Sequence, residues 1–180
     1  FLLGLDEGAA GVGKGLGVCL DLLDHEPAQR RFAAQNVFEF ALLFARKLKV
    51  PVIITDLDQS RVDKGLDYIR GEVDKMLEKG RVSSDDANQI KALVSGTTDK
   101  TLFADCDWVI EAVFEELGVK QQVFSEIEPI ISETAILATN TSSLSVEDIG
   151  ANLANPERLV GFHFFNPVAV MPLIEVVKVP

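Results

Sequence analysis

The chain has 180 residues, of which 47% are hydrophobic and 25% charged, so intrinsic disorder and collagen-like repeats are excluded. This length corresponds to one domain or slightly more. The 17 Lys and Arg residues against 28 Asp and Glu residues give a net charge of −11, which repels nucleic acid and anionic lipid. We therefore expect neither nucleic acid nor a membrane as a partner.

The two cysteines, Cys19 and Cys106, lie far apart and form no CxxC motif, so they supply neither a disulfide framework nor a metal knuckle. A reducing compartment fits this pattern best, and we expect a cytoplasmic protein without a metal site. No apolar run approaches the roughly 20 residues of a membrane span, and the chain starts at Phe1 without a signal-peptide pattern. We interpret the sequence as a fragment or a processed piece.

Residues 1–37 differ from the rest of the chain, because glycines crowd the first 17 positions and a polar stretch follows. Gly8 to Lys14 meets most of the P-loop spacing, but Gly15 replaces the Ser or Thr that would bind magnesium. Flexible chain is the alternative interpretation. A strand at 18–23 would follow the glycines instead of preceding them, so we leave residues 1–37 unassigned.

From residue 37 onward, apolar residues at helical spacing predict a helix that ends near Lys49. The elements expected after it are a strand at 50–56, helices at 61–79 and 83–92, a turn at 95–97, a strand at 108–113, a helix at 120–131, a strand at 135–140, a helix starting near 145, and strands at 159–164 and 173–177. Apolar strands alternating with helices predict an α/β fold. We expect a Rossmann-like, doubly wound, mostly parallel sheet with helices on both faces.

Polar residues lie at or just after the carboxyl ends of several of these strands, at the edge where such a sheet binds ligands. They are Asp56, Glu111 with Glu115, Asn140 with Ser142, and His163 with Asn166. An acidic residue at the position of Asp56 can bind a ribose hydroxyl and disfavours a 2′-phosphate, which favours NAD over NADP. The alternative is that Asp56 only complements the dipole of the following helix.

His163 lies in an apolar strand, where a lone histidine is usually a core residue. We expect Glu175, an isolated carboxylate in the next apolar strand, to be buried, and a buried anion needs a partner, for which an imidazole is a plausible candidate. A His–Glu pair makes a general base whose tautomer the carboxylate sets. A structural buried pair is the alternative.

Several ordered motifs carry a family resemblance. They are Asn140-Thr141-Ser142-Ser143-Leu144, His163-Phe164-Phe165-Asn166-Pro167-Val168 and Leu173-Ile174-Glu175-Val176, together with Ile54-Thr55-Asp56 and Ile110 to Glu115. From about Ala41 to Pro180, the sequence resembles the NAD-binding domain of the L-3-hydroxyacyl-CoA dehydrogenases. Residues 56–96 look closest to the dehydrogenase region of multifunctional fatty-acid β-oxidation proteins.

The resemblance implies oxidation of a 3-hydroxyacyl-CoA to the 3-ketoacyl-CoA, with a hydride passing to NAD. It implies a catalytic group in which His163 takes the hydroxyl proton, Glu175 orients His163, and Ser142 hydrogen-bonds the substrate oxygen, with Asn166 beside them. It also implies that Asp56 holds the adenosine ribose and that Glu115, Lys120 and Asn140 line the cofactor. The partner would be an acyl-CoA, in a homo-oligomer or a multifunctional β-oxidation complex.

The sequence departs from this family in two places. Where the family has a Gly-x-Gly-x-x-Gly turn for the pyrophosphate, residues 32–37 contain no glycine, and the cluster at 11–17 lacks a preceding strand. The family also continues past a position like Pro180 into an all-helical domain. We therefore expect 38–180 to be the NAD-binding domain, without the helical domain, and turnover by this chain alone to be very slow. The alternative is a non-catalytic or truncated relative that keeps the fold and has lost NAD binding.

Overall fold

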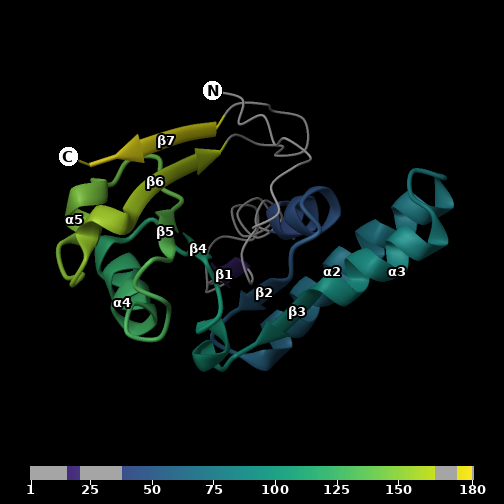
Figure 1. The fold of residues 1–180 in the computed structure, drawn as a ribbon, viewed down its shortest axis with the longest axis horizontal. Helices are drawn as coiled ribbons and strands as arrows, with labels where there is room; N and C mark the ends of the chain where they lie inside the picture. The colour runs from purple at the N-terminus through teal and green to yellow at the C-terminus, as the bar shows by residue number, and fades with distance from the viewer. Residues whose placement is uncertain (1–15, 21–37, 165–173, 180) are drawn as a thin grey trace.

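The computed structural model describes residues 16–20, 38–164 and 174–179, and Figure 1 shows how their helices and strands are arranged. The strands are β1 (Leu16–Leu20), β2 (Val52–Thr55), β3 (Val94–Thr97), β4 (Trp108–Ala112), β5 (Ile136–Thr139), β6 (Leu159–Phe164) and β7 (Ile174–Lys178). A helix covers residues 38–47, and the later helices are α2 (Gln59–Glu78), α3 (Ser84–Leu93), α4 (Leu117–Ile127) and α5 (Val146–Gly150). Two 3-10 turns are η1 (Lys100–Phe103) and η2 (Pro156–Arg158).

Within the described residues, the strands form one seven-stranded sheet in the order β3-β2-β1-β4-β5-β6-β7. Neighbouring strands are parallel except β6 and β7, which are antiparallel. The order reverses between β1 and β4, as in dinucleotide-binding sheets, where ligands bind outside the carboxyl ends of the strands at the reversal. The predicted α/β, Rossmann-like, mostly parallel sheet is confirmed.

Successive apolar residues along the strands let helices pack on both faces of the sheet. In β4, Val109 belongs to one buried cluster and Ile110 to the other, and in β5 Leu137 and Ala138 are divided in the same way. The cluster with Ile110 includes residues of helix 38–47, α2 and α3, whereas the cluster with Val109 includes residues of α4 and α5. Because neighbouring strand residues point to opposite faces, each cluster covers one face.

Aromatic side chains fix helix 38–47 against the part of the sheet that carries β6. The ring centroids of Phe40 and Phe164 lie 4.3 Å apart. The ring centroid of Trp108 lies 5.4 Å from that of Phe44 and 5.1 Å from that of Phe162. Such ring pairs contribute about 0.5–1.5 kcal/mol each beyond their buried area. Since Phe162 and Phe164 face this cluster, the residue between them on β6 points to the opposite face.

The structure corrects the expectation for residues 1–37, because Leu16–Leu20 form β1 in the middle of the sheet. The β1 backbone pairs in parallel with β2 on one side and with β4 on the other. The strand starts two residues before the range considered above, among glycines that lower strand propensity and so obscure it. The P-loop-like stretch and residues 32–37 lie outside the described residues.

A second correction concerns residues 95–97, which the sequence predicts as a turn and which belong to β3. This strand pairs in parallel with β2, with Gly96 opposite Ile54. A Cβ atom on Gly96 would lie 2.4 Å from Cγ1 of Val62, so the glycine lets α2 pack closely on the sheet. Tertiary packing therefore decides the conformation of a segment whose local composition favours a turn.

The described residues contain no helix that is both long and apolar enough to cross a membrane. Within the same part of the chain, no group of three or more His, Cys, Asp or Glu side chains could hold a metal ion.

Candidate functional site

A cleft of about 450 Å³ lies between the segment that leads into α5 and the antiparallel pair β6–β7. Its lining includes Ser142, His163 and Glu175, three of the four predicted catalytic residues. The fourth, Asn166, lies outside the described residues. His163 and Glu175 are direct partners in the β6–β7 register, and Nδ1 of His163 lies 2.9 Å from Oε2 of Glu175. The structure therefore brings this predicted pair together.

The expectation that Glu175 is buried is wrong, because its side chain is 55% exposed and that of His163 is 27% exposed. Every residue of β7 is exposed, so Glu175 stands on a solvated strand beside the cleft. A carboxylate in this position needs no partner to offset desolvation. The interpretation as a structural buried pair therefore loses its basis, whereas the hydrogen bond still orients the imidazole ring.

Gly161 lets the segment before α5 approach the strand that carries His163. A Cβ atom on Gly161 would lie 2.9 Å from Cγ2 of Val146 and 3.0 Å from Cβ of Val177. The side chain of Ser145 caps α5 by accepting a hydrogen bond from the Asp148 N–H, at 3.1 Å. The cap and the glycine together place Ser142 and His163 on the same cleft.

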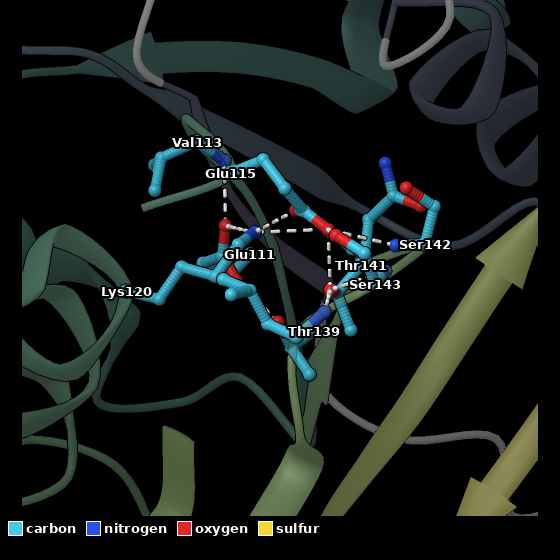
Figure 2. A network of polar contacts seen from close by, with 10 residues as sticks. Glu111, Val113, Glu115, Lys120, Thr139, Thr141, Ser142 and Ser143 are labelled. Atoms are coloured by element: carbon cyan, nitrogen blue, oxygen red, sulfur yellow. Dashed lines mark hydrogen bonds and ion pairs between the residues drawn. The ribbon is translucent and has the colours of Figure 1, made fainter. Parts of the chain in front are cut away.

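Glu115 organises the loop that carries Ser142 (Figure 2). Its Oε1 accepts hydrogen bonds from Oγ1 of Thr141 at 2.6 Å, from the Ser142 N–H at 2.9 Å, and from the Ser143 N–H and Oγ at 3.1 and 3.2 Å. Partial burial opposes ionisation, but these hydrogen bonds and the Lys120 ammonium outweigh it and lower the Glu115 pKa to about 2. Glu115 is thus an ionised anchor for residues 141–143.

Lys120 is predicted to line the cofactor, but the structure places its side chain in the interior with no exposed surface. Its Nζ lies 2.8 Å from Oε1 of Glu111, which is also fully buried, and 2.9 Å from the carbonyl oxygen of Asn140. Burial raises the Glu111 pKa, and Lys120, Thr139 and the Val113 N–H oppose that rise. Lys120 therefore does not face the cofactor edge directly; from the interior it holds the main chain of Asn140 at the carboxyl end of the sheet.

At the end of β2, Asp56 is almost fully buried and accepts a hydrogen bond from the Leu57 N–H at 2.6 Å. Its Oδ1 lies 3.8 Å from Nη1 of Arg61. The cap of α2 is Asp58, whose side chain accepts a hydrogen bond from the Arg61 N–H. Because Asp58 caps α2, this geometry speaks against the alternative that Asp56 only complements the dipole of that helix.

Sequence reasoning placed Glu111 at the ligand edge but did not predict its ion pair with Lys120, nor the roles of Thr139 and Thr141 as donors to Glu111 and Glu115. The signal available in the sequence is a threonine at the end of an apolar strand, Thr139, and a second one shortly after it, Thr141. The preceding apolar strand in the chain likewise has carboxylates near its end, Glu111 and Glu115. The pairing itself depends on β4 and β5 being neighbours.

The sequence model of the 3-hydroxyacyl-CoA dehydrogenase NAD-binding domain matches residues 38–180. The chain belongs to this family. Among solved structures, (S)-3-hydroxybutyryl-CoA dehydrogenase from Ralstonia eutropha is 26% identical with a TM-score of 0.75, over 92% of this chain and 54% of that one. The 3-hydroxybutyryl-CoA dehydrogenase from Escherichia coli K12 is 28% identical with a TM-score of 0.76, over 92% of this chain and 32% of that one.

The dehydrogenase part of multifunctional enzyme 1 from C. elegans is 24% identical with a TM-score of 0.66, which is a likeness in fold alone. The match covers 91% of this chain and 34% of the C. elegans chain. This member of the 3-hydroxyacyl-CoA dehydrogenase family therefore spans about half, or less, of the length of these solved relatives.

Proposed function

We propose that this chain takes part in the oxidation of an L-3-hydroxyacyl-CoA to the 3-ketoacyl-CoA, with NAD as the hydride acceptor, as a step of fatty-acid β-oxidation. The observation that carries the proposal is the 2.9 Å hydrogen bond between His163 and Glu175 on a cleft that Ser142 also lines. A full-length protein would bind acyl-CoA as a homo-oligomer or within a multifunctional complex. A cytoplasmic location stays a prediction.

The cleft residues fit the proton chemistry of this reaction. When Nδ1–H of His163 donates to the Glu175 carboxylate, Nε2 is the nitrogen that accepts the substrate hydroxyl proton. The Glu175 carboxylate then stabilises the imidazolium that forms. The Ser142 hydroxyl would donate to the substrate oxygen and hold it near His163, and Asn166 would complete this group.

The residues at the carboxyl edge also fit a dinucleotide. Asp56 would hold the adenosine ribose at the end of β2, while Glu115 and Asn140 lie on the other side of the β1–β4 reversal, with Lys120 behind them. NAD, when bound, supplies a nicotinamide ring that accepts the hydride. The two carboxylates Asp56 and Asp58 around Arg61 disfavour an additional 2′-phosphate.

A titration of the chain with NADH tests cofactor binding, following energy transfer from Trp108, the only tryptophan in the sequence. We expect saturable binding at micromolar NADH. No binding up to millimolar NADH would instead support the non-catalytic relative that keeps only the fold.

Reduction of acetoacetyl-CoA by NADH tests the catalytic pair. The parent chain alone is expected to turn over slowly, so the rates of its variants are compared with that parental rate. His163→Gln should lower it at least 100-fold, within the range that general acid–base groups contribute, and leave the NADH affinity unchanged. Glu147→Gln, on the same cleft, is the matched control and should keep the parental rate. Equal rates in the parent and His163→Gln would contradict the proposed role.

A further inference from the structure

We propose that Glu111 is a positioning residue of the site: through Lys120 it holds Glu115 and the loop of residues 140–143, which carries Ser142, in place. Glu111 lies in β4, has no exposed surface and does not line the cleft. It therefore acts through other residues. That this loop holds the substrate rests on the proposed dehydrogenase function. That Glu111 keeps the loop in place does not depend on it.

Glu111 uses both carboxylate oxygens and its main chain at the junction of β4 and β5 (Figure 2). Its Oε1 accepts hydrogen bonds from Nζ of Lys120 at 2.8 Å and from the Val113 N–H at 2.6 Å, and its Oε2 accepts one from Oγ1 of Thr139 at 2.5 Å. Its carbonyl oxygen accepts a hydrogen bond from the Asn140 N–H at 2.8 Å. One residue thus connects the first turn of α4 with the ends of two neighbouring strands.

Lys120 passes this constraint on to the loop. Its Nζ donates to the carbonyl oxygen of Asn140 at 2.9 Å and lies 3.6 Å from Oε2 of Glu115. Glu115 in turn uses Oε1 for Thr141, Ser142 and Ser143. The Lys120 ammonium therefore lies between two carboxylates: the buried Glu111 holds it in place, and it holds the more exposed Glu115 in place.

Stability alone does not account for this arrangement. Replacing a buried ion pair by apolar residues of similar volume is often neutral or stabilising, because desolvating two charges is costly. What the Glu111–Lys120 pair supplies is the position of the lysine amine, which Glu111 holds 2.9 Å from the carbonyl oxygen of Asn140 and 3.6 Å from Oε2 of Glu115. The two roles can be separated by removing both charges at once.

The test uses the full chain with the double variant Glu111→Gln/Lys120→Met, which leaves no unpaired buried charge. Amide hydrogen exchange is measured by NMR at Ser142 and Ser143, whose N–H groups donate to Glu115. We expect both amides to exchange at least tenfold faster than in the parent, while the amide of Ile54 in β2 keeps its parental rate. Parental exchange at Ser142 and Ser143 in the folded double variant would overturn the proposal.

A matched control removes the Arg158–Glu128 ion pair, whose side chains are 9% and 11% exposed and which holds the main chain of Ala154 and Asn155 instead. Glu128→Gln/Arg158→Met should leave exchange at Ser142 and Ser143 unchanged, and an equal acceleration there would overturn the proposal. If the first double variant does not fold, Thr139→Val decides: we expect about threefold faster exchange, and the parental rate would refute the role.

An NADH titration of the same variants separates this inference from the proposed function. We expect the Glu111→Gln/Lys120→Met variant to bind NADH at least tenfold more weakly than the Glu128→Gln/Arg158→Met control. Equal affinities would overturn the role of Glu111 in the site. If the parent itself does not bind NADH, the proposed function fails, while the exchange rates still decide whether Glu111 positions the loop.

Discussion

Glu115 follows β4 by three residues and accepts four hydrogen bonds from three consecutive residues of the next loop. All four bonds go to Oε1, and an ionised carboxylate accepts them more strongly than a neutral carboxyl group does. The other oxygen, Oε2, lies 3.6 Å from the Lys120 ammonium, which also opposes its protonation. The loop geometry therefore favours the charged form, which is the physical reason for a Glu115 pKa of about 2 despite partial burial.

This pKa predicts a pH dependence of stability. Because the folded pKa of about 2 lies below the ordinary value of 4.5, Glu115 stabilises the fold fully above pH 4.5 and loses that contribution as the pH falls toward 2. Glu115→Gln should lower the melting temperature at pH 7, and its difference from the parent should shrink between pH 4.5 and 2. Thermal unfolding at pH 7, 4.5 and 2.5 checks this, with Glu116→Gln as control. A constant difference would contradict the assignment.

Arg61 lies between two carboxylates, with Nε 2.8 Å from Oδ2 of Asp58 and Nη1 3.8 Å from Oδ1 of Asp56. Asp56→Asn should increase the affinity for NADPH relative to NADH about tenfold, or ~1.4 kcal/mol, because one charge that repels a 2′-phosphate is lost while Arg61 keeps its ion pair with Asp58. Competitive titrations with the two cofactors measure the ratio. Asp63→Asn, on the exposed side of α2, is the control, and an unchanged ratio for Asp56→Asn would refute this part of the proposed cofactor site.

Among the elements, α2 has two glycines whose surroundings differ. At Gly65 a Cβ atom would lie 2.5 Å from Cε1 of Phe38 and 3.1 Å from Cδ1 of Ile54, whereas at Gly71 nothing lies within 4 Å. Gly65 therefore sets how closely α2 approaches helix 38–47 and β2, while Gly71 only lowers the helix propensity of α2.

We expect opposite effects from the same substitution at these two positions. Gly65→Ala should lower the free energy of unfolding by about 1–3 kcal/mol, because a packed core does not accept an additional methyl group. Gly71→Ala should raise it by about 0.5–1 kcal/mol, because alanine is the better helix former. Urea unfolding of both variants measures the two changes, and destabilisation of similar size at both positions would contradict the packing argument.

For the molecule as a whole, the net charge of −11 matters because the proposed ligands, NAD and acyl-CoA, carry phosphates. In the described structure, two cations of α2 form ion pairs, Arg61 with Asp58 and Lys75 with Glu72, so their charges are partly neutralised. This arrangement fits a solvated helix face better than a basic patch for coenzyme A.

A salt titration measures the balance between this overall charge and local cations. We expect the NADH dissociation constant to fall about twofold between 20 and 150 mM NaCl, because salt screens the repulsion between an acidic chain and an anionic ligand. A dissociation constant that rises with salt would instead indicate a local basic patch at the site. A neutral osmolyte, sucrose at matched osmolality, is the control.

The sequence by itself predicted most of the elements, the parallel α/β sheet and the pairing of His163 with Glu175, because apolar periodicity and a few ordered motifs are local signals. It did not predict β1 or β3: Leu16–Leu20 and Val94–Thr97 are glycine-containing segments that become strands by pairing with neighbours distant in the chain. The exposure of Glu175 and the burial of Lys120 with Glu111 were likewise decided by the tertiary structure. Whether a charged side chain is solvated or buried depends on which strand lies at the edge of the sheet and on which helix covers the strand that carries the charge. The spacing of residues along the chain does not contain this information.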